Sequence, residues 1–200
     1  MLRHLIQHRP RFKVLLAGSH TIEEYQRWAS YLINVQVLYI SYLQEDEARQ
    51  LIEHPVKDFP LCYEADAVER VLELTRCHPC LVQLLCAEIV ALKNEQDPTH
   101  RRLATLRDVD RSAPKALSSG SFFFADIERN QVNAAGLELL RFLAAKGEGI
   151  IVTKKALSRQ FPDELNSTLD LLLPRELIEQ VGDGYRFQVE LIRRWFAKAR

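Results

Sequence analysis

Two cysteines with C-x-x-C spacing are the residues of this chain whose types and spacing most directly suggest a chemistry. Cys77 and Cys80 flank a His-Pro pair, and a thiol in such a motif at a helix N-terminus can have a lowered pKa, which favours thiol–disulfide exchange. A redox motif of this kind usually follows a strand, whereas an amphipathic helix over 65–75 precedes this one. Cys80 and Cys86 also fall on an apolar helix, where free cysteine acts as a small hydrophobic side chain. We therefore favour structural thiols, with redox chemistry as the alternative.

Other potential metal ligands and catalytic side chains are sparse. A zinc site at the two cysteines would need further ligands, and only His78 and Cys86 are near in the sequence. His4 and His8 are four residues apart on one face of a predicted helix, but no third ligand is evident. No nucleophile, base and acid occur in a pattern typical of an active site. We expect no catalytic residues and no metal site in this sequence.

The sequence contains no phosphate-binding loop. The motif G-x-x-x-x-G-K-[ST] needs glycines whose backbone N–H groups surround the phosphates, and none of the 7 glycines begins such a run. No apolar strand ends in an aspartate that could hold a Mg²⁺-bound water. We therefore expect that these 200 residues do not hydrolyse ATP on their own.

Composition and charge narrow the class of protein. Lys+Arg and Asp+Glu both number 27, so the net charge is zero and the bulk charge does not indicate a nucleic-acid-binding protein. A hydrophobic content of 47% is ordinary for a soluble globular chain. No apolar run is long enough to cross a membrane, and the first residues do not resemble a signal peptide. The sequence predicts a cytoplasmic protein.

The first part of the chain predicts a piece of a parallel sheet. Residues 12–19 and 35–40 are apolar runs typical of buried strands, with a helical pattern at 23–31 between them. One strand–helix–strand unit is too little for a sheet domain, so we expect a partner to supply the remaining strands. Ser19 follows the first strand at the edge where ligands of open sheets bind, although it can simply cap the next helix.

A small helical bundle is predicted over the middle of the chain. Periodic apolar residues indicate helices over 65–75 and 80–93, the second being the most buried. A helix with acidic residues in its first turn is expected to begin near Gln44 and to stop at Pro55. A further short helix is expected after Thr105, ending at Val109.

The segment 112–121, which contains Pro114 and Gly120, is the predicted linker. Beyond it, Phe122, Phe123 and Phe124 are expected to pack as the first turn of the next domain.

A helix, strand, helix, helix and hairpin, in that order, predict a winged helix in the last third. Asn133 is expected to cap its first helix and Thr153 its second. The third is expected over 163–173, and residues 182–184, Gly-Asp-Gly, form a tight hairpin tip. A winged helix can place its third helix in the DNA major groove.

The charges of that third helix oppose DNA binding. The segment carries Asp163, Glu164 and Asp170, which phosphates repel. The basic side chains that could still contact a DNA backbone are Lys154, Lys155, Arg159 and Arg186. We favour protein contact or intramolecular regulation over DNA binding.

Three short segments occur in an order known from one family. Residues 14–19 end an apolar strand in Gly-Ser, residues 42–48 read YLQEDEA, and residues 74–83 read LTRCHPCLVQ. In these segments the chain resembles the C-terminal part of AAA+ and STAND-type P-loop ATPases, where they form the late core strand, the start of the helical lid and a turn near the adenine. Cys77 stands where the family usually has glycine, so cysteine would be strained there if the turn needs a positive φ.

The resemblance implies a domain organisation. Residues 1–43 would be the end of a P-loop nucleotide domain, residues 44–111 a helical lid and residues 120–200 a winged helix. The implied fold class is α+β and mostly helical, with a partial P-loop sheet edge.

The resemblance also implies a function. Ser19, His78 and Pro79 would lie near the nucleotide of a parent protein whose cofactors are ATP and Mg²⁺. This chain would be the regulatory lid and winged-helix segment of a STAND/AAA+-like ATP-binding signalling protein, and the parent would be the ATPase. Its partners would be an upstream P-loop nucleotide domain, in cis or in trans, and a protein effector. The alternative is a winged-helix DNA-binding transcriptional regulator.

Overall fold

The computed structural model describes residues 41–198. The chain divides into two compact units, residues 1–40 and 41–200, and everything described below belongs to the second. The predicted strands at 12–19 and 35–40, the helix between them and Ser19 lie outside the described residues. The described part is mostly helical with two small sheets, which confirms the predicted α+β, mostly helical class. Among its helices, none combines the length and the apolar character needed to cross a bilayer.

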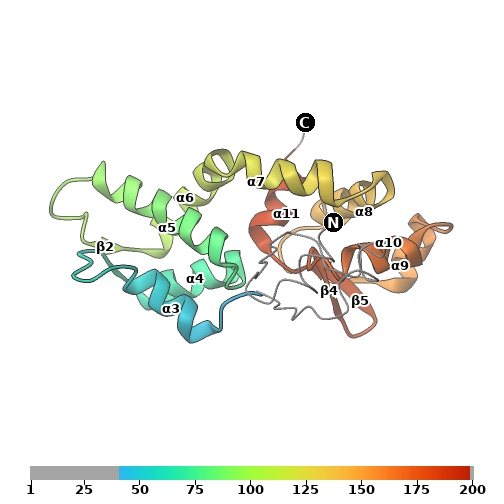
Figure 1. Ribbon diagram of the computed structural model, residues 1–200, viewed down its shortest axis with the longest axis horizontal. Helices are drawn as coiled ribbons and strands as arrows, with labels where there is room; N and C mark the ends of the chain where they lie inside the picture. Colours follow the sequence, from blue (N-terminus) through green and yellow to red (C-terminus); the bar gives the residue numbers. More distant parts are fainter. Residues whose placement is uncertain (1–40, 199–200) are drawn as a thin grey trace, which may run out of the picture. The chain divides into compact units, whose positions relative to one another are not determined.

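The first three described helices follow their sequence signals closely (Figure 1). Helix α3, Glu45–Glu53, has acidic residues in its first turn and ends before Pro55. Helix α4, Ala65–Thr75, has the predicted bounds. Helix α5, Pro79–Asn94, begins with proline at its first position, where the missing N–H costs no hydrogen bond. Their apolar faces form the core of the bundle.

Helix α6, Leu106–Ser119, runs through the segment predicted as a linker. The hydroxyl of Thr105 caps it by accepting a hydrogen bond from the backbone N–H of Asp108 at 3.3 Å. Pro114 interrupts its hydrogen bonding, yet the helix continues because one of its faces is buried against α4 and α5. The prediction of a short helix followed by a linker at 112–121 is therefore wrong. The buried apolar residues that outweigh the proline are Val109, Ala113, Ala116 and Leu117.

A short helix and one turn of π-helix follow α6. Helix α7, Ser121–Asp126, leads directly into the π-helical turn η2, Ile127–Gln131. Phe124 is fully buried and its ring stacks on that of Trp195 with the centroids 5.4 Å apart. Phe122 is 90% exposed, so the expected packing of the three phenylalanines is wrong for this one. The exposure follows from the helix, because successive residues of a helix point to different sides.

The last third has the element order predicted from the sequence. Asn133 caps the first of these helices by accepting a hydrogen bond from Gly136 N–H at 2.8 Å, and Thr153 caps the second by accepting one from Ala156 N–H at 3.3 Å. The elements are α8 Ala134–Ala144, β3 Val152–Thr153, α9 Lys154–Gln160, α10 Leu165–Leu172, β4 Ile178–Val181 and β5 Gly184–Phe187.

The three strands form an antiparallel sheet in the order β3-β5-β4. Gly182, at φ +60°, lies in the turn between β4 and β5. Gly184 is needed for a different reason: a Cβ there would lie 2.6 Å from Cγ2 of Ile151 and 2.8 Å from the carbonyl oxygen of Val152. The close approach of β3 to β5 therefore requires glycine at the start of β5.

Helix α11, Glu190–Ala197, connects the bundle to the last third. It contacts α4, α6 and α8, and Figure 1 shows it between the α3–α6 group and the C-terminal elements. A second, two-stranded parallel sheet, β1 Cys62–Tyr63 with β2 Leu103–Ala104, lies at the other end of α4. The buried apolar residues form one continuous core.

Candidate functional site

The loop between α8 and β3 presents one carboxylate to two helices. Gly147 and Gly149 have φ values of +110° and +69°, which glycine adopts without strain, and Glu148 lies between them. Its Oε1 accepts a hydrogen bond from Nη1 of Arg70 at 2.6 Å, and its Oε2 accepts one from Nη2 of Arg194 at 3.0 Å. Arg70 is on α4 and Arg194 on α11. Glu148 therefore joins the loop to both helices.

Arg70 is the centre of a wider network. Its side chain is 17% exposed, and its guanidinium group also donates to Glu73 at 2.9 Å and to Asp110 on α6 at 3.1 Å. A guanidinium group has five N–H donors and can serve several carboxylates at once. We call this set, together with Glu148 and Arg194, the ionic junction.

Ion pairs within α11 and a hydrogen bond to the end of α8 hold the first turns of α11 in place. The carboxylate of Glu190 accepts hydrogen bonds from Arg193 at 2.7 Å and from Arg194 at 2.9 Å. Nη1 of Arg193 also donates to the carbonyl oxygen of Ala144 at 2.8 Å, at the end of α8. Arg194 thus shares its donors between Glu190 and the ionic junction.

These contacts determine the protonation state of Glu148. The hydrogen bond from Arg70 lowers its pKa from 4.5 to about 2, burial opposes this change, and Arg194 adds to the lowering. The carboxylate is ionised at any pH near neutrality.

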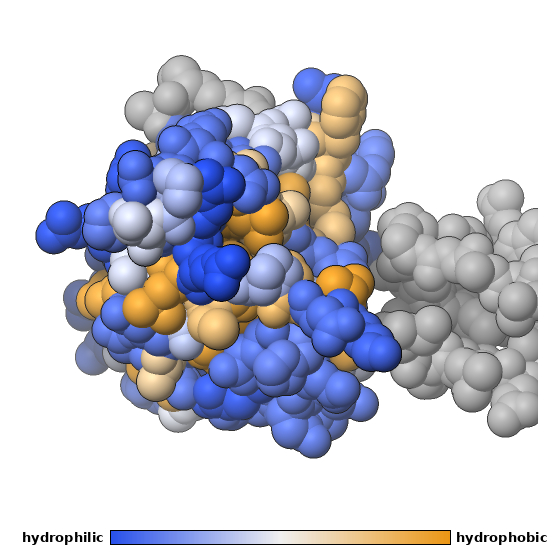
Figure 2. All heavy atoms as spheres, turned by 90° about the vertical axis from the view of Figure 1, so that its left-hand side faces the viewer, coloured by the Kyte–Doolittle hydropathy of each residue, from blue (hydrophilic) through white to orange (hydrophobic). Residues whose placement is uncertain are grey.

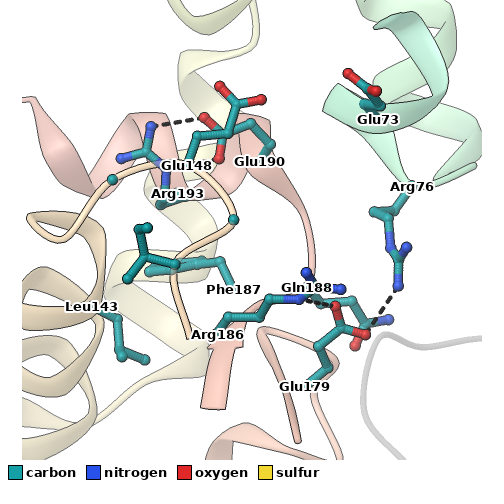
Figure 3. A pocket seen from close by; sticks show the side chains of 13 residues that line it. Glu73, Arg76, Leu143, Glu148, Glu179, Arg186, Phe187, Gln188, Glu190 and Arg193 are labelled. Carbon is teal, nitrogen blue, oxygen red and sulfur yellow. Dashed lines mark hydrogen bonds and ion pairs between the residues drawn. The ribbon is translucent and has the colours of Figure 1, made fainter. Parts of the chain in front are cut away.

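A second ionic link connects the end of α4 to the hairpin. Arg76 directly follows α4, and its Nη2 donates to Oε2 of Glu179 on β4 at 2.9 Å. Nε of Arg186 on β5 donates to the other oxygen of the same carboxylate at 2.7 Å. Figure 3 shows Glu179 between the two guanidinium groups.

A cavity of about 360 Å³ is lined by residues of α4, the 147–150 loop, the hairpin and α11. Charged side chains of both ionic links face it together with the apolar side chains of Leu143 and Phe187 (Figure 3). Close-packed interiors resist displacement, whereas an open, charged interface can shift with little loss of packing. The cavity therefore leaves part of the boundary between α4 and the hairpin unpacked.

The turn between α4 and α5 has an uncommon backbone conformation. Arg76 and Cys77 have φ values of +50° and +62°, and each non-glycine residue held there costs about 1–2 kcal/mol. Leu43 N–H donates to the carbonyl oxygen of Cys77 at 3.1 Å, and His78 N–H donates to that of Thr75 at 3.0 Å. The turn does need a positive φ where the resembled family has glycine.

His78 is the most enclosed of the residues expected near a nucleotide. Its ring centroid is 5.1 Å from that of Tyr42 and 5.5 Å from that of Phe123. Burial lowers the pKa of its imidazole, and within residues 41–198 its Nδ1 has no hydrogen-bond partner. Pro79 follows as the first residue of α5. Ser19 is outside the described residues, so only these two can be placed.

The surroundings of Cys77 do not favour a reactive thiolate. Cys77 and Cys80 are both free thiols. Burial, followed by the charge of Glu45, raises the pKa of the Cys77 thiol, which reduces the fraction of reactive thiolate. Over the described range, no three His, Cys, Asp or Glu side chains are placed to hold a metal ion.

The four basic residues considered for DNA contact do not lie together on one surface. Lys154, Lys155 and Arg159 are exposed together on α9, whereas Arg186 is bound to Glu179 and lines the cavity. The exposed polar residues of α10 and the turn before it are Asp163, Glu164, Asn166, Ser167 and Asp170. The acidic character predicted for this surface is therefore present.

Sequence reasoning did not identify the ionic junction. Glu148 and Arg70 are separated by 78 residues, and neither belongs to a recognised motif. The only local signal is the acidic residue between two glycines, which marks a turn but not its contacts.

Comparisons of the sequence with protein-family models and with curated proteins find no match. The function is therefore inferred from the geometry of the two ionic links and from the turn before α5.

Proposed function

We propose that this chain is the regulatory lid and winged-helix segment of a STAND/AAA+-like ATP-binding signalling protein. A P-loop nucleotide domain, in cis or in trans, would bind ATP and Mg²⁺, and the 200 residues described by this sequence would not hydrolyse ATP alone. One observation supports the proposal most: the turn expected near the adenine is linked to the C-terminal hairpin through Arg76, Glu179 and Arg186. A displacement of that turn would therefore act on the hairpin through these ion pairs.

The ion pairs of the two ionic links are weak enough to rearrange, as a switch requires. Arg76 is 46% exposed and Glu179 23%, and ion pairs at such exposure contribute about 0–1 kcal/mol each. Two states of a regulatory protein differ by only a few kcal/mol, and a ligand shifts them by its differential affinity. A few weak pairs can therefore exchange partners when nucleotide binds, whereas a large apolar interface would resist.

The apolar contact on α11 provides the fixed point of this motion. Phe124 stacks on Trp195, and α11 also contacts α4 and α8. We infer that the elements on either side of α11 shift slightly about it while the apolar core stays packed and the ionic junction opens and closes. The hairpin and α9 would then present an altered surface to a protein effector.

The cellular location belongs to the same proposal. A nucleotide-dependent switch of this class would work in the cytoplasm, where ATP and Mg²⁺ are available. Residues 41–198 include no helix suited to crossing a membrane.

The second candidate is a DNA-binding regulator, and the exposed Lys154, Lys155 and Arg159 on one short helix favour it. The acidic surface of α10 opposes it, because that helix would have to approach phosphates. An electrophoretic mobility assay with duplex DNA separates the two. We expect no shift even at low salt; a shift that weakens steeply with added salt would favour the regulator.

Calorimetric titration of Mg-ATP tests the main proposal. The sample is this chain joined to the P-loop domain encoded in frame upstream of Met1, or mixed with one encoded by a neighbouring gene. We expect binding by the joined or mixed protein and no measurable binding by the 200 residues alone. Tight binding by the 200 residues alone, or the lack of a P-loop domain at either place, would contradict the proposal.

A further inference from the structure

A continuous row of side-chain rings connects the turn before α5 to α11. The ring centroids of Tyr42 and His78 are 5.1 Å apart, and those of His78 and Phe123 are 5.5 Å apart. Phe123 meets Phe124 at 5.2 Å, and Phe124 stacks on Trp195 at 5.4 Å. Rings attract one another at centroid distances of about 4.5–7 Å, so every contact falls in the favourable range. We call these residues the ring row.

The ring row crosses four parts of the fold. Tyr42 precedes α3, His78 is the N-cap residue of α5, Phe123 and Phe124 lie on α7, and Trp195 lies on α11. Phe124 is fully buried and the other members are half-buried. Closely packed side chains pass displacements to their neighbours. A change at the turn can therefore reach α11 through the rings.

His78 is the member of the ring row whose charge can change near neutral pH. Burial raises the pKa of Tyr42 above its ordinary value, so its hydroxyl stays neutral. Phenylalanine and tryptophan side chains do not titrate. Histidine is the side chain that ordinarily gains a proton between about pH 5 and 8.

The position of His78 disfavours its protonated form in three ways. Its ring is held between Tyr42 and Phe123, and burial lowers the pKa of the imidazole, which an interaction with its own backbone opposes only in part. Within residues 41–198 its Nδ1 has no hydrogen-bond partner, so a proton there would have no acceptor. His78 also caps a helix of 16 residues at the N-terminus, where the macrodipole repels a cation.

The charged groups around the turn do not compensate a positive imidazole. Arg76 and Cys77 precede it in the turn. The charge of Glu45 on α3 acts on the Cys77 thiol, and that of Glu176, before β4, acts on the Tyr42 hydroxyl, where Arg76 opposes it. Among the described residues, no carboxylate pairs with the imidazole.

We propose that the ring row is a proton-sensitive coupling, in which protonation of His78 separates its ring from Phe123 and loosens the contact between the turn and α11. The unfolded chain binds this proton more readily than the folded protein does. The stability contributed by neutral His78 is therefore complete above about pH 6.5 and is lost as the pH falls below that value. The coupling needs no nucleotide, so it does not depend on the proposed function.

Two pH titrations of the full chain test the proposal. NMR follows the imidazole of His78, and fluorescence follows Trp195 after Trp28→Phe removes the other tryptophan. We expect the midpoint of His78 to lie below 6.5 and the emission of Trp195 to change with the same midpoint. This comparison within one protein needs no substitution in the ring row.

His78→Phe keeps a ring in the row without a titrating group, so the pH response of Trp195 should be lost. The matched control is His100→Phe, which should keep the response. His100 is exposed in the segment before β2, and Figure 2 looks onto this end of the bundle, whose surface is largely hydrophilic. Melting temperatures at neutral pH show whether the variants remain folded.

A second pair of variants interrupts the row between its ends. Phe123→Leu keeps an apolar side chain but removes the ring between His78 and Phe124, so His78 should still titrate while Trp195 no longer responds. Phe122→Leu makes the same change at the neighbouring position, which is 90% exposed, and should keep the response.

Four results would overturn the proposal. The first is a His78 midpoint at or above 6.5, which attraction of a cation by the ring faces of Tyr42 and Phe123 would produce. The others are an emission of Trp195 that does not follow His78, a response that survives in His78→Phe, and equal responses in the two phenylalanine variants.

Discussion

The carboxylate of Glu148 receives hydrogen bonds from guanidinium groups of two helices, and it is 41% exposed. We expect Glu148→Gln to lower the free energy of unfolding by about 1 kcal/mol, a value reduced by solvent screening. Urea denaturation measures this change. Glu138→Gln, an exposed site on α8, is the matched control, and we expect a change there below about 0.5 kcal/mol. Equal effects at both sites would mean that the ion pairs of Glu148 do not stabilise the ionic junction.

The buried pair of Lys93 and Asp108 has a different role, because it holds α5 to α6. Nζ of Lys93 is 2.9 Å from Oδ2 of Asp108, and the two side chains are 5% and 8% exposed. Burial alone would raise the pKa of Asp108, but hydrogen bonds from Thr105, Lys93 and Gln96 bring it from 3.8 to about 2. The folded protein therefore binds this proton less readily than the unfolded chain does.

The lowered pKa of Asp108 predicts a dependence of stability on pH. Its contribution, about 2 kcal/mol, is present above pH 4 and is lost as the pH falls from about 4 to about 2. Asp108→Asn should remove that part of the pH dependence and cost about 3 kcal/mol at neutral pH, since Lys93 stays buried without its counter-charge. Thermal unfolding over this pH range measures both. The exposed Asp163→Asn is the control, and a pH profile unchanged in Asp108→Asn would contradict the assignment.

The strained turn before α5 allows a comparison that isolates backbone conformation. Cys77 has a φ of +62°, where alanine is strained and glycine is not. Both Cys77→Gly and Cys77→Ala remove the thiol, so we expect the glycine variant to be the more stable of the two by about 1 kcal/mol. Chemical denaturation of both variants tests this. Alanine being as stable as glycine would mean that the turn is not strained at this residue.

At the scale of elements, the hairpin depends on having glycine, with no side chain, at position 184. Gly184→Ala would place a Cβ 2.8 Å from the carbonyl oxygen of Val152, a backbone atom that cannot move without shifting β3. We expect a loss of about 2–3 kcal/mol. Gly182→Asn, at φ +60° with open space around it, should cost less than about 1 kcal/mol because asparagine tolerates this conformation. Differential scanning calorimetry measures the stability of both variants. If Gly182→Asn were less stable than Gly184→Ala, this account of the hairpin would be contradicted.

Local signals were sufficient for several elements. Helix α4 has the bounds that its apolar spacing predicts, and the side chains of Thr105, Asn133 and Thr153 cap helices as expected. Each of these features depends on residues within three or four positions of one another, so the local sequence is enough to predict it.

Signals that depend on tertiary contacts were missed. Pro114 indicates a break on local grounds, but burial of one face of α6 outweighs it. Arg70 and Glu148 are 78 residues apart, and Arg76 and Glu179 are 103 apart. Such pairs form only after the helices have packed, so the candidate site could not be predicted even where the elements around it were.

At the scale of the whole described unit, α11 is held both by ring contacts and by ion pairs. Phe124 and Trp195 stack on one side, while Arg194 joins the ionic junction. Apolar stacking resists separation, and exposed ion pairs can exchange partners at small cost. This difference is the physical basis for proposing a hinge at α11.

Hydrogen–deuterium exchange, measured with and without Mg-ATP on these residues joined to a P-loop domain, tests the relay most directly. The account predicts that nucleotide changes the exchange of residues 76–79 and of the β4–β5 hairpin together. In Arg76→Ala the change at the turn should persist while the change at the hairpin is lost. A nucleotide response confined to the P-loop domain, or a hairpin that responds equally in Arg76→Ala, would contradict the account.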